Sequence, residues 1–182
     1  MRLRLLLPSF ALCLFAVQMM ATEWQSRHTE TSSSAASCPV TPAPSPAFTP
    51  PAPYPPNPPS GSFWFGTEKL WTLLRADGTW QNLPHSDSGY GQKLFWWRDS
   101  YDWKAEPQPK VIVTAKRLDA AAPAVSAPRA SNGYRQEDWK SFMVVGIDIP
   151  KAGCWQITGR YGSDELTFVV RVAAQQQEGS NH

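Results

Sequence analysis

The sequence predicts an all-β fold, a single antiparallel β-sandwich domain that follows a proline-rich N-terminal segment. Three observations lead to this prediction. Beyond Gly61 the chain consists of short runs of β-branched and aromatic residues separated by turn residues. No long stretch of that region repeats its apolar residues with the 3.6-residue period of a helix. The 182-residue chain, once a leader and a linker are set aside, has the length of one domain with one core.

Residues 1–21 are typical of a secretory signal peptide. Arg2 and Arg4 precede an apolar stretch from Leu5 to Val17, and Ala21 stands where a signal peptidase would cleave. The apolar stretch is short for a transmembrane helix, so we expect no stable membrane span if the leader is cleaved. An uncleaved anchor is the alternative. We therefore expect export to the periplasm or the extracellular space, with the protein either free or associated with the envelope.

Residues 22–60 are expected to form no regular fold of their own. They are rich in Ser and Thr up to Ser37, and from Pro39 to Pro59 about every second residue is proline. Proline has no N–H to donate to a sheet, so this stretch favours polyproline II. It would act either as a semi-rigid spacer or as a segment lying on an aromatic groove of the domain. The tail, residues 175–182, is expected to be disordered.

The folded domain is expected to span residues 61–174. Candidate strands are residues 62–66, 69–74, 79–80, 93–98, 111–118, 141–149, 153–161 and 165–172. Gly162 and Ser163 fall in a hairpin turn between the last two strands, and residues 119–138 are expected to be the longest loop. Strands of this length and spacing favour a sandwich of the immunoglobulin-like type.

Side-chain alternation assigns the faces of the last two strands. Cys154 falls on the outer face or at the corner before its strand, and the residue after it faces inward. The indole N–H of that residue, Trp155, needs a hydrogen-bond partner if it is buried. The inward faces form the predicted structural core, with the members Trp155, Ile157, Tyr161, Phe168 and Val170.

Two cysteines remain if Cys13 leaves with the leader. In an exported chain an even number of cysteines is expected to pair. A Cys38–Cys154 disulfide would hold the proline-rich segment across the domain. Two free thiols, or lipidation of Cys38, are the alternatives.

The run KLFWWR, residues 93–98, departs from ordinary alternation because both of its faces are apolar. One set of rings is expected to face the core. The other set is covered by the proline-rich segment, by a loop or by a partner, or it forms an exposed aromatic platform for sugar rings or a protein. The candidate ligand surface comprises Tyr90, Trp96, Trp97, Tyr101 and Trp103.

No catalytic or metal site and no cofactor is predicted. His85 is the one histidine of the domain and lies in an expected turn, and no Gly-x-Ser-x-Gly motif is present. Histidines and cysteines are too few for a zinc site. Asp99, Asp102 and Glu106 do not have the spacing of an EF-hand loop. The chain has 17 Lys and Arg against 15 Asp and Glu with no run of either sign, which argues against a nucleic-acid partner.

Several motifs together resemble a group of uncharacterised exported bacterial single-domain proteins. They are "CPVT" followed by prolines, "GSFWFGTEKLW", "GYGQKLFWWRDSYDWKAEP", "VTAKRLD", "MVVGIDIPKAGCWQITGRY" and "LTFVVRV". The match extends from Cys38 to Val172. The resemblance implies a small secreted β-domain in which Cys38 and Cys154 are paired, and it implies no chemistry.

We therefore expect an exported, non-enzymatic binding or structural module of the cell envelope. Its partner is unknown and would be a polysaccharide or an envelope protein. A carbohydrate-binding module that uses surface aromatics is the alternative. An envelope hydrolase with unidentified carboxylates is the second alternative.

Overall fold

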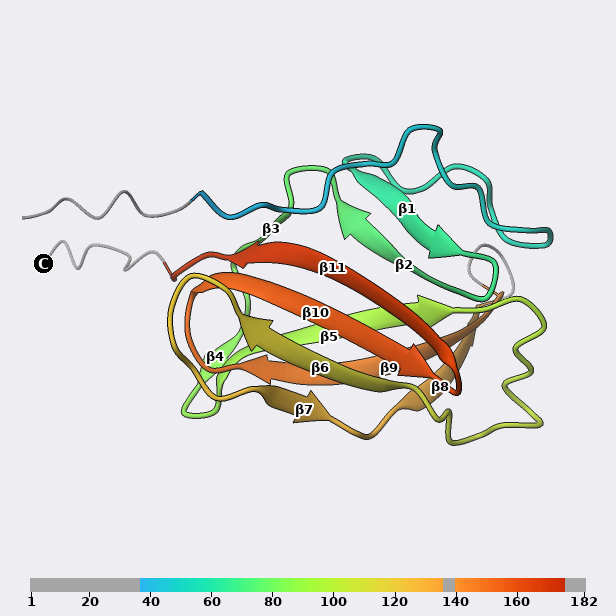
Figure 1. The fold of residues 1–182 in the computed structure, drawn as a ribbon. Helices are drawn as coiled ribbons and strands as arrows, with labels where there is room; N and C mark the ends of the chain where they lie inside the picture. Colours follow the sequence, from blue (N-terminus) through green and yellow to red (C-terminus); the bar gives the residue numbers. More distant parts are fainter. Residues whose placement is uncertain (1–36, 136–139, 176–182) are drawn as a thin grey trace, which may run out of the picture. The chain divides into compact units, whose positions relative to one another are not determined.

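The computed structural model describes residues 37–135 and 140–175, and within these ranges the chain forms eleven strands in two facing sheets (Figure 1). Sheet A has the order β1-β2-β5-β9-β8, with β4 paired to β5, and sheet B has the order β3-β11-β10-β6-β7. All pairs are antiparallel except the short parallel pair of β3 and β11. The strands are β1 (Ser62–Thr67), β2 (Leu70–Arg75), β3 (Thr79–Trp80), β4 (His85–Ser86), β5 (Gly89–Trp97), β6 (Ile112–Arg117), β7 (Val125–Ala127), β8 (Ser131–Arg135), β9 (Lys140–Ile149), β10 (Gly153–Tyr161) and β11 (Asp164–Val172).

This arrangement confirms the predicted all-β, sandwich-like fold. The expected leader, the Ser and Thr-rich residues 22–36 and the tail beyond Gln175 lie outside the described residues. The predicted hairpin turn joins β10 to β11, because Tyr161 pairs with Asp164 around Gly162 and Ser163. Gly162 has a φ of 60°, the positive value that a two-residue hairpin turn with glycine first requires.

The prediction of one long loop over residues 119–138 was wrong. That region contributes β7, which pairs with β6, and β8, which pairs with β9. Both strands consist mainly of Ser, Ala, Asn and Gly, and they lie at the sheet edges. Their pairing depends on the neighbouring strand rather than on local β-propensity, so the sequence pattern does not indicate them.

The inward faces predicted for the last two strands, β10 and β11, form part of the sandwich core on the side of sheet B. Trp155, Ile157, Phe168 and Val170 are buried between the sheets, and Tyr161 is half-buried and packs at the rim of the same cluster. The core prediction is therefore confirmed for four residues, with the fifth at its border. The indole N–H of Trp155 has the partner it needs, because it donates to the carbonyl oxygen of Lys151 at 3.0 Å.

A glycine in β10 brings the two sheets together. A Cβ atom added at Gly159 would lie 2.2 Å from the indole of Trp96, so no other residue fits there without displacing that ring. Trp96 is fully buried and its side chain comes from β5 in the opposite sheet. The large indole is therefore accommodated by the missing side chain opposite it.

A covering segment, residues 38–60, which we call the strap, begins at the predicted disulfide. Cys38 is bonded to Cys154, the outer-face residue of β10, and this bond confirms the predicted pairing. Cys154 is nevertheless only 1% exposed. Next to it, the backbone N–H of Thr41 donates to Val169 at 2.9 Å, and the Thr41 hydroxyl accepts from the Val169 N–H at 2.8 Å. These bonds fix the start of the strap beside β11.

The strap then passes over the outer face of sheet A, and Figure 1 shows it running past β1 and β2. Tyr54 packs edge-on against Trp71 with ring centres 5.1 Å apart, and its hydroxyl donates to the carbonyl oxygen of Ser141 at 3.3 Å. Phe48 packs against the same indole at 6.0 Å. The strap thereby buries a second aromatic cluster on this face, with the members Tyr54, Trp64, Trp71, Trp97 and Phe142.

Candidate ligand surface

Three of the five residues of the candidate aromatic surface are buried rather than exposed. Trp96 is 0% and Trp97 1% exposed, and Tyr101 is also buried. Trp96 faces the sandwich core, whereas Trp97 belongs to the cluster under the strap. The two-faced pattern of residues 93–98 therefore reflects two buried faces. Of the alternatives raised by the sequence, coverage by the proline-rich segment is the one found.

Tyr101 belongs to a polar cluster at the end of the sandwich. Its hydroxyl donates to the carbonyl oxygen of Glu106 at 3.1 Å, and the Glu106 carboxylate accepts from the hydroxyl of Tyr161. Arg98 stacks over the Tyr161 ring at 4.4 Å from its centre. Burial, with a smaller contribution from the charge of Glu106, raises the pKa of Tyr101 to about 12. The contacts order the loop of residues 98–110 and leave both tyrosines neutral at physiological pH.

Two of the predicted aromatics are partly accessible. Tyr90 is half-buried, and its ring centre lies 4.6 Å from that of the exposed His85. Trp103 is also half-buried and stacks on Tyr134 with ring centres 5.5 Å apart and an interplanar angle of 20°. Tyr134, which the sequence analysis missed, is 47% exposed. Its isolated place in the polar run SNGYR gave no signal that it would meet Trp103.

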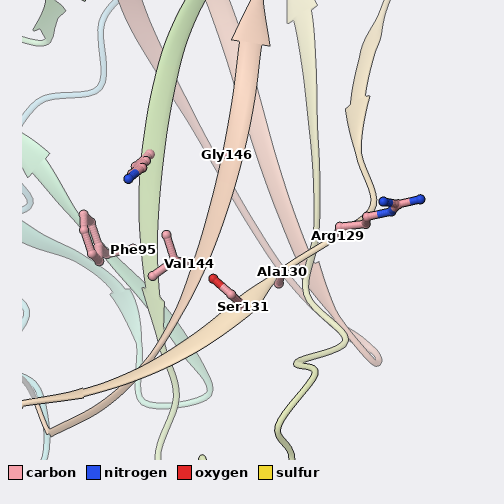
Figure 2. A pocket seen from close by; sticks show the side chains of 7 residues that line it. Phe95, Arg129, Ala130, Ser131, Val144 and Gly146 are labelled. Carbon is pink, nitrogen blue, oxygen red and sulfur yellow. The ribbon is translucent and has the colours of Figure 1, made fainter.

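The hollow part of the outer face of sheet A lies beside the covered aromatic cluster. Strand pairing places Phe95 of β5, Val144 of β9 and Ser131 of β8 in one row across the sheet. One step along, Lys93 pairs with Gly146. Figure 2 shows Phe95, Val144 and Ser131 around this hollow, with Arg129 at its far end. These residues line a cavity of about 520 Å³, and we call this surface the trough.

Gly146 is the open point in the floor of the trough. A Cβ atom added there would have nothing within 4 Å. Lys93 lies on the neighbouring strand β5, and Arg129 precedes β8 on the other side of β9, so cations flank the glycine from both sides. The gap above the backbone thus has Lys93 on one side and Arg129 on the other, and Figure 2 shows the Arg129 side chain extending away from Gly146.

The trough cations form no ion pair with any of the described residues. In the described part of the chain the ion pairs are Arg75–Asp77, Arg117–Asp119 and Arg160–Glu165, and neither Lys93 nor Arg129 takes part in them. Both residues are exposed. Cations that line a hollow without a carboxylate partner create a positive potential there, which attracts anionic groups.

The structure brings together no group of three His, Cys, Asp or Glu side chains suited to a metal ion, within residues 37–135 and 140–175. Over the same residues, no helix has the length and apolar character needed to cross a membrane. Asp99 and Asp102 are exposed and bond to backbone N–H groups of their own loop, at Ser100 and Lys104 respectively.

Comparison with known protein families, with curated proteins and with solved structures finds no match to this chain. Function is therefore inferred from the residues and geometry described above.

Proposed function

We propose that this protein is an exported, non-enzymatic binding module of the cell envelope, and that the trough on sheet A is its ligand surface. The observation on which the proposal depends is a pair of exposed cations, Lys93 and Arg129, which form no ion pair within the described residues and lie on either side of the open Gly146. Concave surfaces with a few convergent polar groups are the usual places where proteins bind ligands.

Export is supported by the leader-like residues 1–21 and by the disulfide. A bond between Cys38 and Cys154 persists in oxidising compartments such as the periplasm or the extracellular space. The same bond fixes the strap, which covers the aromatic half of the outer face of sheet A. The strap therefore keeps a large apolar surface away from unspecific contacts and leaves the mixed polar trough to meet a partner.

The non-enzymatic part of the proposal follows from the surroundings of the trough side chains. Lys93 and Arg129 are exposed, as is Asp148 further along the same surface. A catalytic acid, base or nucleophile is usually activated by burial or by a close charged partner. The exposed side chains of the trough are suited to recognition rather than to chemistry.

The test is retention on cell-envelope fragments of the source organism, measured by co-sedimentation of the purified mature protein. We expect the double variant Lys93→Glu/Arg129→Glu to lose at least about tenfold in apparent affinity, because two attractions become repulsions. Lys116→Glu is the matched control, since Lys116 is an exposed lysine on β6 in the other sheet. Equal retention of the wild type and of both variants would contradict the proposal.

A second candidate function is supported by the exposed stack of Trp103 and Tyr134. Aromatic faces at a surface can pack against sugar rings. The carbohydrate-binding alternative therefore applies to this stack instead of to the buried tryptophans. The amino group of Lys104 lies over the Trp103 ring, 5.7 Å from its centre, and would have to move for a sugar to pack on that face. If this stack is the site, Tyr134→Ala removes retention on insoluble polysaccharide while the trough double variant keeps it.

A further inference from the structure

The trough is the middle of three adjoining hollows. The hollow around Gly146 shares Lys93 and Gly146 with a second one of about 530 Å³, which extends to Gly91 and Asp148. It shares Arg129 with a third one of about 620 Å³, which extends to Lys110. Because neighbouring hollows share lining residues, we treat the three as one path, which crosses β5, β9 and the segment before β8 and ends at residues 108–112. Such a path fits a linear polymer better than a small compact ligand.

The charges along this path are mainly positive but not uniformly so. Lys93, Arg129 and Lys110 are exposed and lie outside the ion pairs of the described residues. Asp148 lies at the opposite end from Lys110. A carboxylate at one end disfavours a polymer with directly adjacent anions, such as polyphosphate, more than a polymer whose anions are separated by sugar rings. It can, however, accept hydrogen bonds from hydroxyl groups.

The floor of the path alternates between apolar and open backbone surface. Val144 and the partly buried Phe95 provide the apolar portion, and Gly146 leaves the backbone open, whereas the Asp148 carboxylate lies over Gly91. Ser131 and Gln92 line the same path with hydrogen-bonding groups. A sugar ring has a C–H face, which suits apolar side chains, and a hydroxyl edge, which suits polar ones. The lining thus matches a polysaccharide whose charged groups are separated by neutral hydroxylated surface.

We propose that the ligand of the trough is an acidic polysaccharide, with its carboxylates bound by Lys93, Arg129 and Lys110 and its sugar rings laid across Gly146. The inference rests on the proposed function, because it names the ligand class of the same surface. Arg129 can hold a sugar carboxylate with two parallel N–H donors. Lys93 and Lys110 act as mobile point charges, which allows a flexible chain to be bound at several points.

The experiment is calorimetric titration of the purified mature protein with polygalacturonate, with fully methyl-esterified polygalacturonate as the uncharged counterpart. We expect binding to the acidic form only, weakened by added salt. Lys93→Glu and Arg129→Glu should each weaken it by roughly tenfold or more, the size expected for one charge-assisted contact. Gly146→Leu should weaken it without a change of charge, because the new side chain fills the open floor. Lys116→Glu is the control and should bind as the wild type does.

Three outcomes would overturn the inference. They are equal binding of the methyl ester, equal or tighter binding of polyphosphate, and equal weakening by Lys116→Glu. Far-ultraviolet circular dichroism and the unfolding midpoint of each variant show whether its fold is intact. If envelope fragments are retained through Lys93 and Arg129 but polygalacturonate does not bind, the proposed function stands and the ligand class is wrong. If the trough variants affect neither assay, both proposals fail.

Discussion

Cys38 and Cys154 are separated by 116 residues in sequence, yet their Cα atoms lie 5.3 Å apart and their sulfurs are bonded. This bond attaches the start of the strap to sheet B, and Tyr54 attaches its later part to sheet A. The strap thus joins both sheets from outside. It also determines which half of the outer face of sheet A is covered and which half remains as the trough.

Removing the disulfide is expected to destabilise the domain substantially. The double variant Cys38→Ala/Cys154→Ala should lose about 2 to 5 kcal/mol of unfolding free energy, because the unfolded chain is no longer closed into a long loop. Urea denaturation measures the loss, and reduced, alkylated wild type should unfold at the same urea concentration as the variant. Alkylation of both thiols in the native protein before any reductant is added would contradict the pairing itself.

Truncating Tyr54 should loosen the strap from the aromatic cluster. Tyr54→Ala removes the ring packed on Trp71 and should lower the unfolding free energy by about 3 kcal/mol, in the range for a buried aromatic. Acrylamide quenching of tryptophan fluorescence should rise as Trp71 becomes accessible. Tyr54→Phe keeps the ring and loses only the bond to Ser141, so it should lose about 1 kcal/mol. Identical quenching in Tyr54→Ala and wild type would show that the strap does not cover this face.

Two glycines, one in the core and one at the surface, allow a matched test of how closely the two sheets pack. Gly159→Ala places a methyl group against the Trp96 indole and should destabilise by about 1 to 3 kcal/mol. Gly146→Ala places the same methyl group in open space and should change stability by less than about 0.5 kcal/mol. Thermal or urea unfolding of the two variants checks both values. Equal effects at the two positions would contradict the close contact of Gly159 with Trp96.

The buried tyrosines predict a loss of stability at alkaline pH. Burial raises the pKa of Tyr54 to about 12, and burial aided by Glu106 raises that of Tyr101 to about 12. Because the folded state holds these protons more tightly than the unfolded state, the stabilisation is complete below the unfolded pKa of about 10. It is then lost as pH rises toward 12. Urea midpoints measured across this window should fall, and they should fall less in Tyr101→Phe.

A urea midpoint of the wild type that stays constant between pH 10 and pH 12 would contradict the burial of these hydroxyls. Ultraviolet titration of tyrosinate gives an independent check, because Tyr54 and Tyr101 should ionise only near pH 12 or on unfolding. Tyr101→Phe should remove one of these late ionisations. The variant keeps the ring in place, so the comparison isolates the hydroxyl.

Local patterns predicted the central part of this fold. Alternation around Trp155 and Phe168 identified the core face of β10 and β11 because side chains on a strand alternate between its two faces. The run at Trp96 and Trp97 is apolar on both faces because one face lies in the core and the other lies under the strap. The sequence alone left open whether this second face was covered or exposed. That choice depends on Tyr54, which lies more than 40 residues earlier and has only prolines and small polar residues around it.

The trough itself could not be predicted from the sequence. Lys93, Arg129 and Gly146 come from three separate segments, and each is an ordinary exposed residue within its own segment. Their proximity follows from the β5-β9-β8 order, which includes a strand that the sequence pattern did not indicate. Surface sites assembled from common residues on different strands give no local signal, in contrast to a glycine-rich phosphate loop or a cysteine-rich metal site.

The most direct test of the account is a nuclear magnetic resonance titration of the isotope-labelled mature protein with oligogalacturonate. The trough account predicts that the amide signals of Lys93, Ser131 and Gly146 shift first and most, while Lys116 on the opposite sheet remains in place. Shifts centred on Trp103 and Tyr134 instead would contradict the assignment of the trough as the ligand surface, and the absence of any shift would contradict the assignment of its ligand as an acidic polysaccharide.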